Sequence, residues 1–239
     1  MPTLVRITTR TDAATDREWS MSHSHEDDSA KPETSCLYAA EERLVEQEML
    51  FLNGMHTVMV LWDVAKFDDS LQYDKLETAC DEQEYGHKRT ALTFVIHASP
   101  RILKIGQAVG KLSFSMGRSI LAGCQTSQTN ARAYSNKAVN KLRASFDVGA
   151  QGNTPTNGTK VYQHVDDLTH MMWHSDAAIL ATKVARAVFC WIQQTRLMEV
   201  GISDKIVIIP PGLPAKAIQQ TFQDEGIEVA IVKHAVDVG

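Results

Sequence analysis

Three aspartates carry the chemistry to which this sequence points. Asp63 ends an apolar, β-branched run at residues 56–64, and Asp166 and Asp167 stand together between two short runs of β-type residues. If the two elements are neighbours in one sheet, the three carboxylates converge at its edge. Carboxylates gathered without a counter-charge repel one another, whereas Mg²⁺ favours oxygen ligands and would stabilise them. Such a site would suit phosphoryl transfer with two metal ions.

The Asp-Asp pair by itself has an ordinary explanation. The chain contains two further pairs, Asp27-Asp28 and Asp68-Asp69, and a pair of this kind usually marks a turn. What distinguishes Asp166-Asp167 is its position between two apolar strand-like runs, with Asp63 on a third.

The elements that would position these acids follow from hydrophobic period and capping residues. In chain order the pattern predicts a helix at 36–54, a strand at 56–64, a helix from Asp69, a helix at 125–146, a hairpin around 166–167, a helix from Ser175-Asp176 to about Val200, a strand at 205–209, a helix at 214–225 and a strand at 228–233. Residues 90–97 and 110–120 fit strands or short helical pieces equally well. The order resembles the split βαβ arrangement of ferredoxin-like sheets, so we expect an α+β fold with Trp62 and Trp191 in its core.

The charge distribution is uneven although the net charge is −5. No Asp or Glu occurs from Tyr85 through Phe146. That tract contains ten basic residues: Lys88, Arg89, Arg101, Lys104, Lys111, Arg118, Arg132, Lys137, Lys141 and Arg143. A basic tract can follow a phosphate backbone while acidic flanks hold metal, but it can equally be a solvated face. We expect the helix at 125–146 to present Arg132, Lys137, Lys141 and Arg143 to solvent.

Other features limit the class of protein. The four cysteines lie far apart with no Cys-x-x-Cys pair, so neither a disulfide framework nor a zinc site is indicated and a reducing compartment is expected. The polar N-terminus lacks the features of a signal peptide, and Lys183 and Arg186 interrupt the most apolar stretch. We therefore expect an intracellular protein, nuclear or cytoplasmic, with no membrane partner and with a loosely structured segment at 1–35.

Five short motifs resemble, in order, those of reverse transcriptases from non-LTR retrotransposons. They are residues 61–70 (LWDVAKFDDS), 122–127 (AGCQTS), 163–168 (QHVDDL), 201–205 (GISDK) and 235–239 (AVDVG). The resemblance covers about residue 55 to the end of the chain.

This resemblance implies a polymerase palm with partial fingers and no thumb. Fingers elements would lie at 36–54 and 81–118, and the palm would comprise 55–80 and 119–239. The implied activity is RNA-directed DNA polymerisation, in which a primer 3′-hydroxyl attacks a deoxynucleotide triphosphate. The implied partners are an RNA template, a DNA primer and the nucleotide.

The resemblance also assigns roles to residues of this chain. Asp63, Asp166 and Asp167 would hold two Mg²⁺ ions, and Lys205 would assist the leaving pyrophosphate. The nucleotide pocket would include Phe67, Asp68, Gly123 and Ser127. Contacts to nucleic acid would come from Lys88, Arg89, Arg101 and Lys104.

Three positions depart from the family pattern. The fifth residue after Asp63, where the family has an aromatic residue that excludes ribonucleotides, is Asp68, and Phe67 stands one place early. Ala122 replaces the usual glutamine of the second motif, and His164 replaces the usual aromatic residue of the third. Two other interpretations therefore remain open: a polymerase-like domain that binds nucleic acid without catalysis, and an unrelated α/β interaction module.

Overall fold

The computed structural model describes most of the chain in two compact units. The described residues are 3–114, 117–121, 124, 126–147, 156–203, 207–209, 215–224, 226 and 230–231. One unit, here the sheet unit, comprises Ser24–Ala65 and Asn136–Gly239, and the other, the helical unit, comprises Met1–His23 and Lys66–Ser135. The sheet unit contains the three aspartates.

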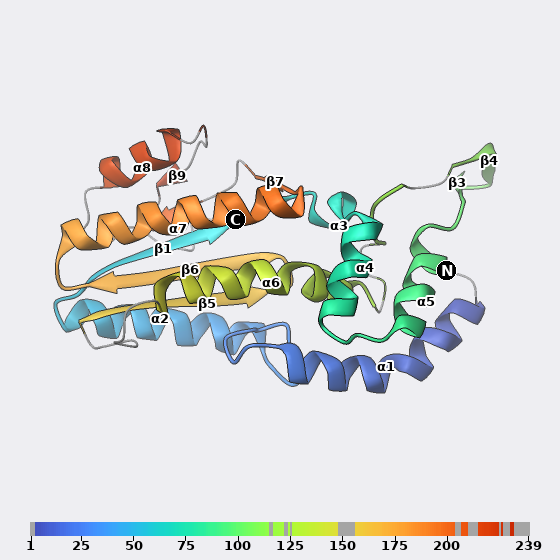
Figure 1. Cartoon of the computed structure of the whole chain (residues 1–239), viewed down its shortest axis with the longest axis horizontal. Coiled ribbons are helices and arrows are strands. Elements are labelled where there is room, and N and C mark those ends of the chain that lie inside the picture. The colour runs from blue at the N-terminus through green and yellow to red at the C-terminus, as the bar shows by residue number, and fades with distance from the viewer. Residues whose placement is uncertain are drawn as a thin grey trace. The chain divides into compact units, whose positions relative to one another are not determined.

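A five-stranded sheet forms the centre of the sheet unit (Figure 1). Its strands, in sheet order, are β5 (Asn157–His164), β6 (Asp167–His174), β1 (His56–Trp62), β8 (Val207–Ile209) and β9 (Ala230–Ile231). Neighbouring strands are antiparallel except β8 and β9, which are parallel. A second, two-stranded sheet continues from β1, where β2 (Val64–Ala65) pairs with β7 (Gly201–Ile202).

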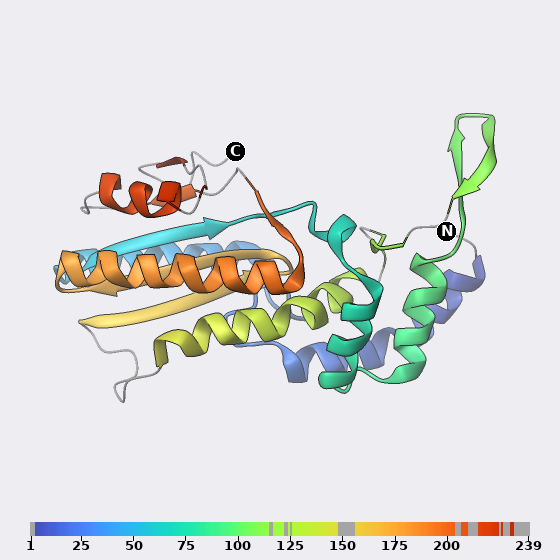
Figure 2. The same ribbon diagram turned by 45° about the horizontal axis from the view of Figure 1, so that its top comes forward.

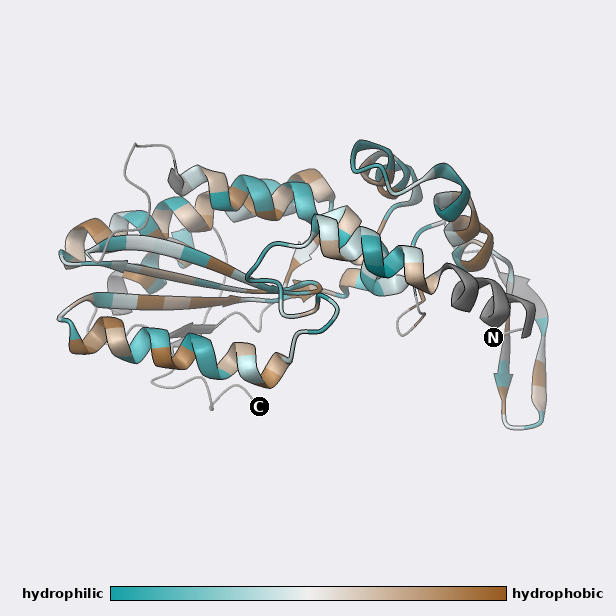
Figure 3. Ribbon diagram, turned by 90° about the horizontal axis from the view of Figure 1, so that it is seen from below, coloured by the Kyte–Doolittle hydropathy of each residue, from teal (hydrophilic) through white to brown (hydrophobic). Residues whose placement is uncertain are grey.

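Helices cover both faces of the sheet, which explains why β1 is apolar without alternation from Val58 to Trp62. Helix α2 (Cys36–Leu52) lies on one face, and α7 (Ala177–Met198) with the later part of α6 (Ser127–Asp147) lies on the other (Figure 3). On the α7 face Trp62 packs near Trp191, with ring centroids 6.3 Å apart. On the α2 face Met59 belongs to a buried cluster with Tyr162, Met171 and Trp173.

Capping residues fix the ends of α7. Asp176 Oδ1 accepts hydrogen bonds from the amides of Ala178 (2.7 Å) and Ile179 (3.1 Å). At the other end Glu199 takes the left-handed conformation with φ 57°. The helix packs against the sheet through the expected stripe: Leu180, Val184, Val188 and Trp191 are all buried. Helix α8 (Ala215–Asp224) packs against α7.

The helical unit is seen most clearly in Figure 2. Its elements are α1 (Thr3–His23), α3 (Phe67–Ser70), α4 (Tyr73–Glu82), α5 (His87–His97), the hairpin of β3 (Arg101–Ile105) and β4 (Ala108–Phe114), and the start of α6. Trp19 on α1 is buried, and its indole Nε1 donates to the Gln83 carbonyl at 2.9 Å. Tyr85 donates through its hydroxyl to Asp16 at 3.0 Å.

Several sequence expectations need correction. Residues 1–35 are not loosely structured throughout, because α1 occupies Thr3–His23. The ambiguous segment at 90–97 lies within helix α5. Arg132 does not face solvent: it is 3% exposed, and its guanidinium donates to Ser20 Oγ. Arg143 is half-buried and donates to the carbonyl of Val161.

Gly158 offers a direct test of the packing on the α2 face. It lies opposite Trp173 in the β5–β6 pair, and a Cβ at this position would stand 1.9 Å from the indole ring. We expect Gly158→Ala to lower the free energy of unfolding by about 1–3 kcal/mol, because Trp173 is buried and must move. Gly201→Ala is the matched control, since its Cβ would meet only Ala65 Cβ at an ordinary 3.6 Å. Urea denaturation of both variants measures the difference, and equal stabilities would contradict this packing.

Among the described residues, no helix is both long and apolar enough to cross a membrane.

Candidate active site at the sheet edge

Strand pairing brings Asp63 and Asp167 to the same edge of the sheet. Strands β1 and β6 pair from His56 with His174 through to Trp62 with Leu168. Asp63 directly follows Trp62 and Asp167 directly precedes Leu168, so both aspartates adjoin the last pair of this register. The amide of Ser203 donates to the Asp63 carbonyl at 3.0 Å, which fixes the backbone where the chain leaves β1 for β2.

Asp166 lies next to this pair in the β5–β6 turn. His164 pairs with Asp167, so the turn contains only Val165 and Asp166. Asp166 is half-buried, and Asp167 is more exposed. The hairpin predicted around the Asp-Asp pair is therefore confirmed, and it places both acids at the end of the sheet where Asp63 lies.

Val165 holds an unfavourable backbone conformation in this turn. Its φ is 59°, in the left-handed region that a β-branched residue rarely adopts. The first position of a two-residue hairpin turn with positive φ normally belongs to glycine. Strain of this kind persists only where the surrounding structure imposes it.

Replacing Val165 by glycine should relieve that strain. We expect Val165→Gly to raise stability by about 0.5–1 kcal/mol, since left-handed backbone costs about 1–2 kcal/mol and glycine loses some entropy on folding. Thermal denaturation should compare this variant with Val165→Ala, which keeps a Cβ and should therefore gain less stability. A loss of stability in the glycine variant would show that the Val165 side chain contributes more through packing than its conformation costs.

The acids at this edge interact electrostatically. Burial raises the pKa of Asp167, the negative charge of Asp63 raises it further, and His164 lowers it. The ionised carboxylates of Asp63 and Asp167 therefore repel each other. A divalent cation held between oxygen ligands would remove that repulsion, so these residues suit the metal that the sequence implies.

The three carboxylates are nevertheless spread more widely than the ligands of a closed metal site. Among the described residues, one set of three metal-ligating side chains has all its ligand atoms within 4.8 Å of one another, and that set is His25, Glu26 and Asp27. Asp63, Asp166 and Asp167 do not form such a set.

His164 lies beside the candidate site, and in the sequence it was visible only as a departure from a motif. Its Nδ1 lies 3.1 Å from Ser29 Oγ and 3.6 Å from Cys36 Sγ. Ser29 reaches it because residues 27–29 pair with the edge strand β5: the Gln163 amide donates to the Asp27 carbonyl, and the Ser29 amide donates to the Gln163 carbonyl. Nothing in the polar sequence at 24–35 signalled this pairing.

The residues expected in the nucleotide pocket lie in the helical unit or outside the described residues. Phe67 is 3% exposed and packs edge-on against Tyr134, so in this structure it is a core residue. Asp68 is half-buried, and burial together with the charge of Asp69 raises its pKa. Ser127 is buried and donates to the Cys124 carbonyl at 2.6 Å. Gly123 and Lys205 lie outside the described residues.

The four basic residues expected to contact nucleic acid differ in their surroundings. Lys88 and Lys104 are exposed. Arg89 is partly buried, with its Nε 3.9 Å from Asp16 Oδ1 and its guanidinium carbon 5.7 Å from the Tyr85 ring centre. Arg101 is the first residue of β3, and its side chain is not among those that the structure describes.

Comparison with solved structures identifies the fold. Telomerase from Candida tropicalis truncated from its C-terminal domain superposes with a TM-score of 0.53 at 17% identity, covering 86% of this chain and 40% of that one. The apo telomerase gives 0.55 at 14% identity, covering 87% and 36%, and its complex with a telomeric RNA fragment gives 0.56 at 13% identity, covering 88% and 34%. No protein-family model and no curated protein matches the sequence. The chain thus spans about a third to two fifths of the telomerase chains, and it shares the fold of that part of them.

Proposed function

We propose that this chain is the polymerase domain of a reverse transcriptase, which adds deoxynucleotides to a primer 3′-hydroxyl on an RNA template. One observation supports it above the rest: Asp63 follows and Asp167 precedes the last β1–β6 pair, Trp62 with Leu168, beside the turn that contains Asp166, and the charge of Asp63 raises the pKa of Asp167. This sheet edge lies within a fold shared with telomerase. Carboxylates placed together at the cost of repulsion are typical of a functional site.

The side chains at this edge would divide the work of nucleotidyl transfer. The carboxylates of Asp63, Asp166 and Asp167 would hold Mg²⁺ and orient the attacking hydroxyl toward the α-phosphate. When bound, a pair of Mg²⁺ ions activates the attacking oxygen and stabilises the leaving oxygen. Lys205, by its place in the fourth motif, would offer a proton or a positive charge to the departing pyrophosphate. Little covalent chemistry falls to the protein, because positioning and electrostatics provide most of the catalysis.

The order of the five motifs supports a retroelement enzyme within this class. An RNA partner gains support from the telomerase neighbour whose structure includes a fragment of telomeric RNA. Lys88 and Lys104, both exposed in the helical unit, are the proposed contacts to the nucleic-acid backbone. Arg89 and Arg101 are proposed with them on sequence position alone.

Primer extension tests the proposal. The wild-type chain, supplied with Mg²⁺, an RNA template annealed to a labelled DNA primer and deoxynucleotides, should extend the primer. Asp166→Asn should not, because it removes one carboxylate charge with almost no change of shape. Asp74→Asn, on the exposed first turn of α4, is the matched control and should extend the primer as the wild type does.

Two other results would favour different functions. If no variant extends the primer but the wild type binds the template–primer duplex in a salt-dependent manner, the domain binds nucleic acid without catalysis. If the wild type neither extends the primer nor binds the duplex, the result favours an unrelated interaction module. Extension by Asp166→Asn at the wild-type rate would overturn the assignment of the site.

A further inference from the structure

Helix α2 contacts the sheet through polar as well as apolar side chains. Glu46 Oε2 accepts hydrogen bonds from Lys160 Nζ at 2.8 Å and from the Tyr162 hydroxyl at 2.5 Å. Arg43 Nη1 donates to Thr169 Oγ1 at 3.3 Å. Leu50 packs against the buried cluster of the sheet, yet no residue of α2 is itself buried.

The opposite side of α2 is exposed, and it carries seven large apolar side chains together with the carboxylates of Glu41, Glu42 and Glu48. A surface helix normally has its apolar stripe on the core and its polar face in water. We call this exposed side the α2 outer face, and its residues, with their exposed fractions, are Leu37 (69%), Tyr38 (66%), Leu44 (44%), Val45 (58%), Met49 (55%), Phe51 (58%) and Leu52 (77%). Single exposed apolar residues need no explanation, but a stripe along a whole helix indicates a binding surface.

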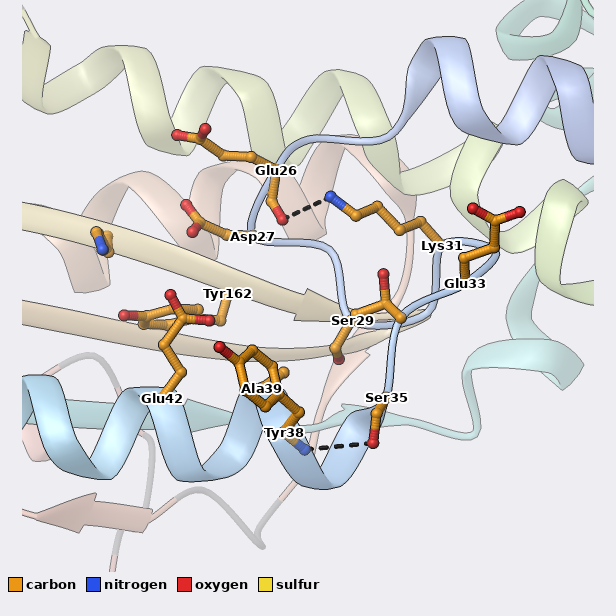
Figure 4. Close-up of a pocket in the computed structure, with 12 residues that line it drawn as sticks. Glu26, Asp27, Ser29, Lys31, Glu33, Ser35, Tyr38, Ala39, Glu42 and Tyr162 are labelled. Carbon is orange, nitrogen blue, oxygen red and sulfur yellow. Dashed lines mark hydrogen bonds between the residues drawn. The ribbon is translucent and has the colours of Figure 1, made fainter.

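An acidic pocket adjoins the N-terminal end of this face (Figure 4). The pocket has a volume of about 640 Å³ and lies between α2, β5 and the segment at 26–35. Its charged lining consists of four carboxylates, from Glu26, Asp27, Glu33 and Glu42, and two ammonium groups, from Lys31 and Lys160. Lys160 is already paired with Glu46, so the acidic excess is larger than this count suggests.

The aromatic lining of the pocket joins it to the outer face. Tyr38 belongs to both: it lines the pocket, and it begins the apolar stripe with Leu37. Tyr162 lines the inner side, where the ammonium of Lys160 and the guanidinium of Arg43 lie 5.9 Å and 5.5 Å from its ring centre. Carboxylates beside aromatic rings form a favourable site for an alkylammonium or guanidinium group.

We propose that the α2 outer face and the acidic pocket together dock an amphipathic helix of a partner protein. The partner helix would lay apolar side chains along Tyr38, Val45 and Met49 and would place a Lys or Arg side chain in the pocket. Helix α2 is 17 residues long, or about 25 Å, which sets the matching length of the partner. This inference is independent of the polymerase proposal, since none of its residues belongs to the sheet-edge site.

Charge selects this occupant over the alternatives. Glu41 and Glu48 lie within the outer face, so an antiparallel second copy would bring carboxylates together along the contact. The same carboxylates oppose a nucleic-acid backbone or an anionic membrane. A basic apolar helix satisfies both the stripe and the pocket, in the way that amphipathic helices occupy apolar grooves elsewhere.

A designed peptide can serve as the probe with the full chain. It is a fluorescein-labelled helix of about 18 residues built from leucine and lysine at helical spacing, long enough to match α2. A peptide of the same composition in scrambled order has no apolar face, and a leucine–glutamate version has the opposite charge. We expect saturable one-to-one binding of the first peptide by fluorescence anisotropy, and binding at least about tenfold weaker for the other two.

Variants of the chain locate the contact. Val45→Gln with Met49→Gln should weaken peptide binding at least about tenfold, because both side chains are more than half exposed and central to the stripe. Asp27→Asn with Glu42→Gln should weaken it several-fold and reduce its salt dependence. Phe189→Gln with Leu197→Gln, which changes exposed apolar residues of α7, is the matched control and should bind within about twofold of the wild type.

The outcomes are decisive in each direction. Equal binding of the scrambled peptide, or unchanged binding by the Val45/Met49 variant, would overturn the proposal. Light scattering of the peptide-free chain tests whether a second copy occupies the face. If the wild type is a dimer and the Val45/Met49 variant is a monomer, the face binds a second copy and the proposal of a partner helix is overturned. Circular dichroism confirms that each variant remains folded, and primer extension reports separately on the polymerase proposal.

Discussion

Asp63→Asn should abolish Mg²⁺-dependent primer extension while making the metal-free protein more stable. Removing this proposed metal ligand should lower the extension rate by about 10³-fold or more, as expected when metal-ion stabilisation of the transition state is lost. Stability should rise in the same variant, because the negative charge that now raises the pKa of Asp167 disappears. A residue that served only the fold would show the opposite sign in the second measurement.

Divalent metal and pH separate the two effects. In the wild type, Mg²⁺ at about ten times its Kd should stabilise the fold by about 1.4 kcal/mol, and in Asp63→Asn this gain should largely vanish. A raised pKa means that ionised Asp167 costs stability above that pKa and that the cost falls as the pH falls through it. The stability cost of ionised Asp167 should therefore decrease less on acidification from about pH 7 toward about pH 4 in Asp63→Asn than in the wild type.

Differential scanning fluorimetry with and without Mg²⁺ measures both quantities. Asp74→Asn is again the control, since it removes a carboxylate at an exposed position of α4. Asp63→Asn with the wild-type response to Mg²⁺ would show that the metal, if bound, is held elsewhere; the set formed by His25, Glu26 and Asp27 would then be the place to examine.

Trp62→Ala should produce a large loss of stability in the sheet unit. Trp62 is 2% exposed, and its ring lies 6.3 Å from that of Trp191 and 5.6 Å from that of Phe222. Truncating such a side chain leaves a cavity between β1, α7 and α8 and costs about 3–5 kcal/mol. Because Asp63 is the next residue, the loss should extend to primer extension even at temperatures where the variant remains folded.

Trp62→Phe is the informative comparison. The Trp62 indole N–H is buried and finds no hydrogen-bond acceptor among the described residues. Phenylalanine removes that unsatisfied donor while keeping most of the apolar volume, so its cost should stay below about 1.5 kcal/mol. Urea denaturation gives both values. Similar losses for alanine and phenylalanine would indicate that the indole N–H has a partner in solution.

The sequence alone determined the elements whose signals are local. The apolar run at 56–62, the acidic pair between strand-like runs and the capping residue Asp176 each specify their structure through neighbours along the chain. The buried stripe of α7 and the core positions of Trp62 and Trp191 follow from the same period. Asp63 could be chosen as a site residue because it ends such a run.

Features that depend on distant partners were decided by the tertiary structure. Helix α1 has a polar sequence in the part whose side chains are described, and it is held by Trp19 and Asp16 against residues more than sixty positions away. Arg132 was expected in solvent because arginine usually is, but Ser20 accepts its hydrogen bond within the helical unit. Phe67 likewise became a core residue because Tyr134 packs against its ring.

The site shows the same division. Residue types and order named Asp63, Asp166 and Asp167, because a carboxylate at the end of a strand is visible in the sequence. The register of β1 against β6 decided that Asp63 and Asp167 adjoin the same end of the sheet, and the segment at 24–35 decided what surrounds His164. Which strands pair, and which segment covers a sheet edge, depends on hydrogen bonds between backbone groups far apart in the chain. Those groups are the same for every residue type except proline, so the local sequence does not name the partner.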